Sequence, residues 1–233
     1  YELVEQLDLS LPTVNLILKH LTENDYIQDC GTFDSKGGRP PKAFTYNPTL
    51  FYSIGLDITL HHIHTVIIDL SGSVIIKQSD RHDFKPNDSY YKFLCTLVDQ
   101  TLEDAGINGE QILGIGIALP VLINVECQSI LHSNLTEFHN VTLENFQKYL
   151  QFPCYLCNDA NAGGLAENWK IKNTQNTFYL SLNNTVGGAI IQNNSMYLGE
   201  TYESGEIGHV TLINNGRVCY CGKTGCVDAY ISA

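Results

Sequence analysis

The sequence predicts an α/β fold, in which strands and helices alternate along most of the 233 residues. Short runs rich in β-branched and aromatic residues are separated by turn residues, such as the Ser-Gly-Ser at 71–73. Apolar residues recur at helical spacing over 89–106, and a later helix is predicted to run through Trp169. The predicted strands are 52–58, 64–70, 74–78, 112–119, 152–157, 177–182 and 186–192.

Residues 1–50 differ in character from the rest and predict a helix, a turn, a second helix and a hairpin. Ser10 is a good N-cap for the second helix, and Pro12 suits its first turn. The hairpin strands are predicted at 26–30 and 43–46, around a loop of sequence Gly-Gly-Arg-Pro. Apolar residues of the second helix that are expected to face the core are Val14, Ile17, Leu18 and Leu21.

A short polar face on a second helix, after a tight turn, is how a helix-turn-helix presents side chains to the major groove of DNA. The basic hairpin loop would form a wing, with Arg39 able to enter a minor groove. The alternative is a purely structural helix pair, because such pairs with a serine cap are common and this segment holds more acids than bases. The candidate DNA contacts are Thr13, Asn15, Lys19, Lys36, Arg39 and Lys42.

The overall composition excludes several classes of protein. The formal net charge is −12, which argues against a chain adapted uniformly to nucleic acid, so any DNA contact must come from local charge. No apolar run approaches the length of a membrane span, and no leader opens the chain. Because the only methionine is Met196, Tyr1 is not expected to be the translational start.

One imidazole and three thiols recur at short spacing within 205–226, with glycines between them. This is the ligand set of a closed tetrahedral zinc site. A disulfide is disfavoured, since Cys219 and Cys221 are too close in sequence to cross-link comfortably. The other five cysteines are interpreted as reduced core residues, which is typical of a reducing cytosol. The predicted zinc ligands are His209, Cys219, Cys221 and Cys226.

The run Glu-x-Gly-His, followed by Cys-x-Cys-Gly-x-x-Gly-Cys, resembles the signature of the ROK family (repressor, open reading frame, kinase), which comprises bacterial sugar kinases and sugar-responsive repressors. The resemblance implies a ribonuclease-H-like domain of the actin and hexokinase type at 51–233, C-terminally incomplete. It implies a winged helix-turn-helix at 1–50, N-terminally incomplete. It also implies that His209 binds zinc through one ring nitrogen and a sugar hydroxyl through the other. A purely structural zinc knuckle is the alternative.

The Asn-Asp-Ala-Asn segment at 158–161 is similar to the ROK segment that binds sugar hydroxyls. An Asp at the end of a buried strand projects into the crevice where α/β sheets bind ligands, although an N-cap role is the alternative. In ROK kinases this Asp is the catalytic base, so Asp159 would have that role only if kinase activity survives. Asp228 stands where the family usually has Glu. The sugar contacts implied by the resemblance are Asn158, Asp159, Glu206, His209, Asp228 and Asn134.

Two loops argue against phosphoryl transfer, because only glycine lets backbone amides pack closely around phosphates. ROK kinases have an Asp-x-Gly-Gly-Thr turn after the first strand, where this chain has no glycine over 57–62. They also have Gly-Thr-Gly before a Gly-Gly pair, where this chain has Asn-Asn-Thr at 183–185. Weak activity stays open, since Asp57 is retained.

We therefore expect a cytoplasmic, sugar-responsive transcriptional regulator, a repressor, that binds operator DNA, zinc and a small-molecule sugar. Winged-helix proteins usually read paired half-sites, so a homodimer or higher homo-oligomer is expected. The alternative is an ATP-dependent sugar kinase for a hexose or N-acetylhexosamine that kept its DNA module. A third possibility is a DNA-binding protein with a silent pocket that a protein partner controls.

Overall fold

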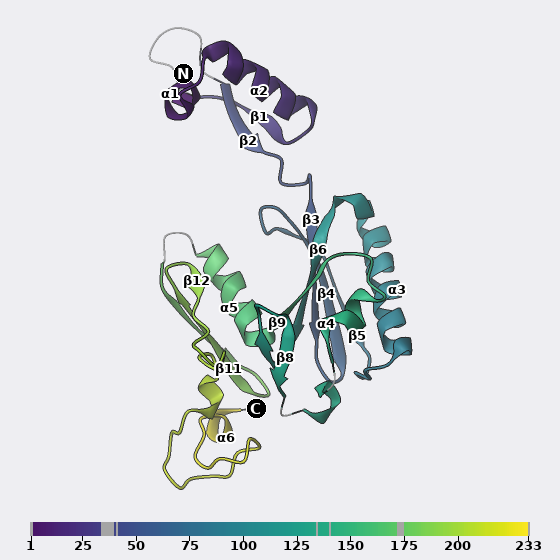
Figure 1. The fold of residues 1–233 in the computed structure, drawn as a ribbon, viewed down its shortest axis with the longest axis vertical. Helices are drawn as coiled ribbons and strands as arrows, with labels where there is room; N and C mark the ends of the chain where they lie inside the picture. The colour runs from purple at the N-terminus through teal and green to yellow at the C-terminus, as the bar shows by residue number, and fades with distance from the viewer. Residues whose placement is uncertain are drawn as a thin grey trace.

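The computed structural model describes residues 2–33, 40, 42–133, 135–139, 141–171 and 175–232. Two parts are joined by a single connection (Figure 1). The N-terminal part comprises two helices and a two-stranded antiparallel hairpin, in the predicted order. Its elements are α1 (Glu2–Leu7), α2 (Leu11–Glu23), β1 (Ile27–Thr32) and β2 (Lys42–Tyr46).

Helix α2 begins where the sequence predicts. Ser10 is its N-cap, and the Ser10 hydroxyl accepts a hydrogen bond from the Thr13 backbone N–H at 3.3 Å. Val14 is buried, as predicted, but Ile17 is 41% exposed. The prediction for Ile17 is wrong because the described helix and hairpin cover only the side of α2 that carries Val14.

The connection between the two parts is bonded to both of them. The Asn47 N–H donates to the Tyr26 carbonyl at 2.9 Å, on the N-terminal side. On the other side, the Leu70 N–H donates to the Pro48 carbonyl at 3.0 Å, and the Gln111 amide donates to the Leu50 carbonyl at 3.4 Å. Each end of the connection is therefore held by hydrogen bonds to the part that it adjoins.

A five-stranded sheet in the order β5-β4-β3-β6-β9 forms the centre of the larger part. The first three strands are antiparallel, whereas β6 and β9 run parallel to β3, so the sheet is mixed, in agreement with the predicted α/β class. Strand β5 extends beyond its predicted end at residue 78, because Arg81 pairs with His62 of β4. The strands are β3 (Tyr52–Ile58), β4 (His62–Asp69), β5 (Val74–Arg81), β6 (Ile112–Leu119) and β9 (Cys154–Asn158).

The main core lies between this sheet and α3 (Asp88–Ala105) (Figure 1). Asn87 caps the start of α3, and Gly106, the last residue of the predicted helical range, ends the helix in the left-handed conformation at φ 66°. Leu94 and Val98 of α3 pack with Ile54 and Ile117 of the sheet, and all four are at most 2% exposed. Each such side chain contributes about 1.5–3 kcal/mol by burial.

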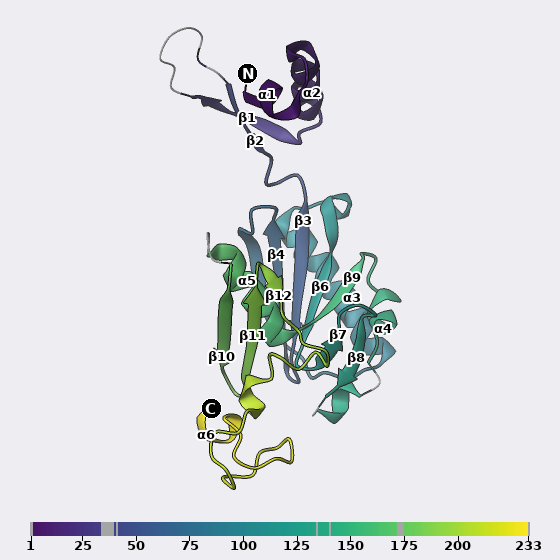
Figure 2. The same cartoon turned by 60° about the vertical axis from the view of Figure 1, so that its left-hand side comes forward.

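Helix α5 (Asp159–Lys170) lies between the central sheet and a second sheet of order β10-β11-β12 (Figures 1 and 2). The close contact depends on glycine, since a Cβ at Gly164 would lie 2.5 Å from the Ala189 Cβ. The second sheet comprises β10 (Thr177–Leu182), β11 (Val186–Gln192) and β12 (Ser195–Met196). The smaller elements are η1 (Gly109–Gln111), β7 (Leu122–Asn124), β8 (Ser129–His132), η2 (Thr136–Phe138), α4 (Leu143–Gln147), η3 (Ile207–His209) and α6 (Asp228–Ile231).

The cysteines outside the motif at 205–226 differ from the prediction in part. Cys154 is buried, and burial raises the pKa of the Cys154 and Cys157 thiols to about 11, so both stay protonated. Cys30 and Cys127 are exposed, however, because they lie in the hairpin strand β1 and in the turn between β7 and β8. Among the described helices, none has the length and apolar character to cross a membrane.

Candidate functional site

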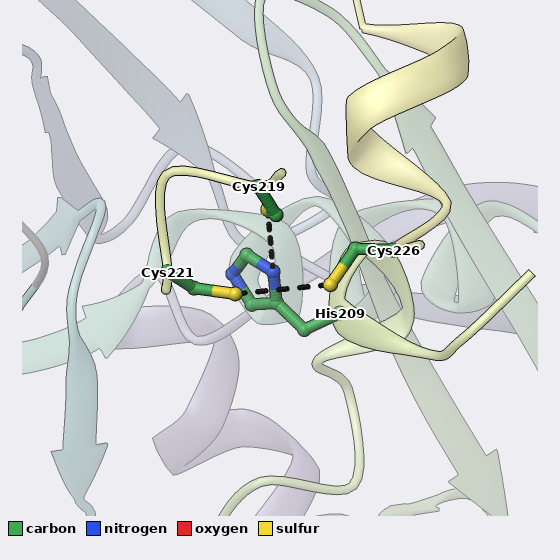
Figure 3. A group of neighbouring side chains, drawn as sticks. All are labelled: His209, Cys219, Cys221 and Cys226. Atoms are coloured by element: carbon green, nitrogen blue, oxygen red, sulfur yellow. Dashed lines mark hydrogen bonds between the residues drawn. The ribbon is translucent and has the colours of Figure 1, made fainter. Parts of the chain in front are cut away.

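His209, Cys219, Cys221 and Cys226 converge on one point, with their ligand atoms all within 4.8 Å of one another (Figure 3). The Cys221 and Cys226 sulfurs are 3.7 Å apart, and His209 Nδ1 lies 3.7 Å from the Cys219 sulfur. Ligand atoms around a tetrahedral zinc with Zn–S bonds of about 2.3 Å and a Zn–N bond of about 2.0 Å are separated by about 3.5–3.8 Å. The four donors therefore have the chemistry that suits zinc, and the two separations of 3.7 Å match a tetrahedral site.

The cysteine loop folds tightly because glycines occupy its turns. Gly222 and Gly225 adopt φ values of 86° and 82°, in the left-handed region that favours glycine. A Cβ at Gly225 would overlap the Ile213 carbonyl oxygen. The Cys219 N–H donates to the Lys223 carbonyl at 2.9 Å, which closes the loop.

The Gly-Glu-Ile-Gly-His segment packs its backbone directly on β11. A Cβ at Gly205 would lie 2.5 Å from the Gly188 carbonyl oxygen, and a Cβ at Gly208 would overlap the Val186 carbonyl oxygen. This contact sets the position of the intervening and following side chains, Glu206 and His209. The two glycines are thus required for close packing and not only for a turn.

Gly208→Ala is expected to destabilise this part of the protein strongly, by more than about 2 kcal/mol, and to reduce metal content. The added methyl group would have to displace the backbone of η3 from β11, because the atom that it meets is a carbonyl oxygen. Thermal unfolding and zinc analysis of the purified chain would measure both effects. The matched control is Gly116→Ala in β6, whose Cβ would make only an ordinary contact at 4.0 Å. Equal melting temperatures for the two variants would contradict this account.

A cavity of about 490 Å³ separates the ends of the two sheets and is bounded on one side by the cysteine loop. The second ring nitrogen of His209, Nε2, lies 3.4 Å from the Tyr220 hydroxyl and 3.9 Å from Glu206 Oε2. Nδ1 therefore faces the thiol cluster, whereas Nε2 faces the Tyr220 hydroxyl and the Glu206 carboxylate in the cavity. Polar residues that line the cavity include Asn158, Asp159, Glu203, Glu206, His209, Tyr220 and Lys223.

Asp159 is the first residue of α5 and follows directly on strand β9. Its carboxylate accepts a hydrogen bond from the Ala160 N–H at 2.8 Å. The residue is open to the cavity, but the surrounding walls limit its hydration. Burial, opposed by the Ala160 hydrogen bond and reinforced by the charges of Asp57 and Glu206, raises the pKa of Asp159 to about 6. A carboxyl group with a pKa near neutrality can take up and release a proton at physiological pH.

Asn158 is the N-cap of α5. The alternative interpretation of Asp159, as the helix N-cap, is therefore wrong. The side-chain oxygen Oδ1 of Asn158 accepts from the Asn161 N–H at 3.0 Å, and the side-chain Nδ2 donates to the Val121 carbonyl at 3.2 Å. The side chain is therefore held in a fixed orientation at the edge of the cavity.

Asp228 does not line the cavity. It is 3% exposed, and its carboxylate accepts a hydrogen bond from the Val186 N–H, which ties α6 to the start of β11. Asn134 lies outside the described residues. Sequence reasoning did not select Tyr220, Glu203 or Lys223. For Tyr220 and Lys223 the available signal was a polar side chain between predicted zinc ligands, whereas Glu203 precedes that motif.

Neither loop that replaces a glycine-rich turn of the kinases contains a close-packed glycine. Thr59 occupies the turn after β3, with its hydroxyl accepting from the His62 N–H at 3.0 Å. His61 Nδ1 lies 2.9 Å from Asp83, at the surface. Burial raises the pKa of Asp57, and the nearby His64 lowers it in part. Side chains thus occupy the region after β3 where the kinases have glycine.

The structure places some of the predicted DNA contacts on the surface, whereas others lie outside the described residues. Thr13, Asn15 and Lys19 are all exposed on α2. Lys19 lies 3.6 Å from Glu23, and Lys42 lies 2.8 Å from Asp29 across the hairpin. Lys36 and Arg39 lie outside the described residues.

The ROK family model matches residues 53–233, which include the whole cavity and the thiol cluster. The chain belongs to the ROK family. A xylose repressor from Caldicellulosiruptor bescii is 30% identical over 229 residues, which cover 97% of this chain and 57% of that protein. The chain thus spans well under two thirds of the length of this ROK relative.

Two solved structures share the ROK fold. A ROK family transcriptional regulator, described as a homolog of the E. coli MLC protein, aligns with a TM-score of 0.73 at 21% identity, over 99% of this chain and 59% of that chain. A ROK family glucokinase from Streptomyces griseus, in complex with glucose and AMPPNP, aligns with a TM-score of 0.67 at 21% identity, over 78% of this chain and 57% of that chain. The mixed α/β fold is therefore common to regulators and kinases of this family.

Proposed function

We propose that this protein is a sugar-responsive DNA-binding regulator of carbohydrate genes, with a kinase-derived effector domain. The observation that carries the proposal is the cavity in which Asp159, Glu206 and His209 converge beside the thiol cluster. A sugar hydroxyl both donates and accepts hydrogen bonds, so carboxylates together with a ring N–H complement it well. The similarity to a xylose repressor over nearly the whole chain supports regulation as the purpose of this binding.

Zinc is the proposed resident metal. Nδ1 of His209 and the thiolates of Cys219, Cys221 and Cys226 would hold it, in a closed site that leaves no position for substrate. A metal on Nδ1 leaves the hydrogen on Nε2, so the imidazole presents a fixed N–H donor toward the cavity.

The N-terminal part is proposed to be a winged helix-turn-helix that occupies 1–50 and precedes the sugar domain. Its exposed polar groups on α2 suit the major groove, and the β1–β2 hairpin would form the wing. A homodimer is proposed, because paired half-sites give such domains their specificity. Sugar must favour one arrangement of the two DNA-binding parts by unequal affinity in order to change operator binding.

Asn15→Ala and Lys19→Ala are expected to weaken DNA binding in different ways. Loss of a base contact at Asn15 would cost about 1–3 kcal/mol on the operator alone, whereas Lys19→Ala would weaken all sequences and lower the salt slope by about one. Fluorescence anisotropy with duplexes from the upstream region of the encoding gene, and with a scrambled duplex, measures both. Lys170→Ala, at the end of α5, is the matched control. Unchanged binding in both α2 variants would exclude α2 as the recognition helix.

The direct test of the proposed function is DNA binding by the zinc-loaded chain with and without a sugar. Xylose is the first sugar to test, followed by glucose and N-acetylglucosamine. A sugar that changes the DNA affinity at least tenfold is the expected result. DNA binding that no sugar alters, together with no heat of sugar binding, would favour control by a protein partner.

A sugar kinase is the second candidate, because a carboxyl group with a pKa of about 6 in a sugar-sized cavity suits a general base. The loops without glycine argue against it. Calorimetric titration with magnesium-ATP, in the presence and absence of sugar, separates the two functions. Micromolar, sugar-dependent ATP binding would favour the kinase.

A further inference from the structure

Tyr220 is part of the cavity wall although it belongs to the cysteine loop. It stands between Cys219 and Cys221, and its side chain turns toward His209. The two rings meet edge to face, with centroids 5.3 Å apart and an interplanar angle of 74°. The residue is 58% exposed, so the ring lies at the mouth of the cavity and is accessible to a ligand.

The Tyr220 hydroxyl and His209 Nε2 are too far apart to form a strong hydrogen bond with each other. Their separation is 3.4 Å, whereas a good N–H···O bond measures about 2.9 Å. A third oxygen can lie within hydrogen-bond distance of both atoms. Both groups therefore keep hydrogen-bonding capacity for a ligand that enters the cavity.

The three groups around Nε2 offer complementary chemistry. Glu206 Oε2, 3.9 Å from Nε2, accepts when ionised. Nε2 donates when Nδ1 faces a metal, and the tyrosine hydroxyl can do both. A ligand with one hydroxyl between Glu206 and Nε2 has its neighbouring hydroxyl within reach of Tyr220. This arrangement matches a pair of adjacent hydroxyl groups.

We propose that Tyr220 is a specificity-determining residue that contacts the effector, and that Tyr220 and His209 together bind two adjacent hydroxyls of the sugar. The inference rests on the proposed function and makes it more specific. The cysteine loop then has two tasks, since it holds the metal and also supplies part of the sugar site. The configuration of the sugar at these two carbons would determine which sugars bind.

The test compares Tyr220→Phe with wild-type, full-chain, zinc-loaded protein by calorimetry. The phenylalanine keeps the ring contact with His209 and removes only the hydroxyl. The probes are the sugar that binds wild-type protein most tightly among xylose, glucose and N-acetylglucosamine, and the set of its monodeoxy analogues. Tyr155→Phe is the matched control, because Tyr155 is 61% exposed on β9 and does not line the cavity.

We expect Tyr220→Phe to weaken binding of the parent sugar about tenfold, at unchanged zinc content, as loss of one hydrogen bond predicts. For one monodeoxy analogue, the variant and the wild-type protein should bind equally, because the partner hydroxyl is already missing. An unchanged affinity for the parent sugar, an equal loss for every analogue, or a fall in zinc content would each overturn the role of Tyr220. Wild-type protein that binds none of the sugars would instead defeat the proposed function itself.

Discussion

Replacing His209 by alanine is expected to remove bound zinc and the sugar response together. The imidazole supplies one of four metal ligands through Nδ1, and the three thiols that remain do not close a tetrahedral site. It also supplies the N–H donor at Nε2, close to Glu206 and Tyr220. We expect zinc affinity to fall by at least about 100-fold and sugar binding to become undetectable.

Zinc per chain, sugar affinity and sugar-dependent DNA binding are the three measurements. Cys219→Ser separates the two roles of the ring, because it impairs the metal site and leaves the imidazole in place. If the metal orients the ring, this variant also loses the sugar response. His62→Ala, an exposed histidine outside the cavity, is the control. Retained zinc with normal induction in His209→Ala would contradict the coupling.

Asp159→Asn is expected to abolish sugar binding while it stabilises the sugar-free protein at neutral pH. The carboxylate is a charged acceptor in the cavity wall, so its loss should cost at least about 100-fold in sugar affinity. The stabilising effect follows from the pKa of about 6, which is above the ordinary value of 3.8 for this side chain.

The sign of the pH effect follows from proton binding. The folded state binds more protons than the unfolded state between these two pKa values, so the Asp159 carboxyl favours folding at low pH. That contribution is lost as the pH rises through about 6, and the ionised carboxylate then opposes folding. Because Asp159 is open to solvent, which screens its charge, we expect the ionised carboxylate to cost about 1 kcal/mol of stability, and not the roughly 3 kcal/mol of a dry site.

Melting temperatures of wild-type and Asp159→Asn protein, measured between about pH 5 and about pH 8, test this prediction. The advantage of the variant should increase with pH. Asp88→Asn is the control of opposite sign, because hydrogen bonds from Tyr149 and Lys148 hold the pKa of Asp88 below its usual value. A pH-independent difference for Asp159→Asn would show that its carboxylate is well hydrated in the folded protein.

The sequence alone predicted those features that depend on residues close together in the chain. The N-cap at Ser10, the helix end at Gly106 and the strand at 112–119 follow from local hydrogen bonding and side-chain periodicity, and the structure has them at the predicted positions. The zinc-ligand pattern was also visible, because its three cysteines lie within eight residues and their spacing is set by a tight loop.

Only the tertiary structure decided which polar groups meet. Asp228 turns away from the cavity because the Val186 N–H, 42 residues earlier in the chain, needs a buried acceptor. Asn158 takes the helix cap and leaves the carboxylate of Asp159 facing the cavity. Tyr220 meets His209 across a loop closed by glycines, so its role has no signature in local periodicity. Local patterns determine elements and caps, whereas contacts between distant side chains depend on how those elements pack.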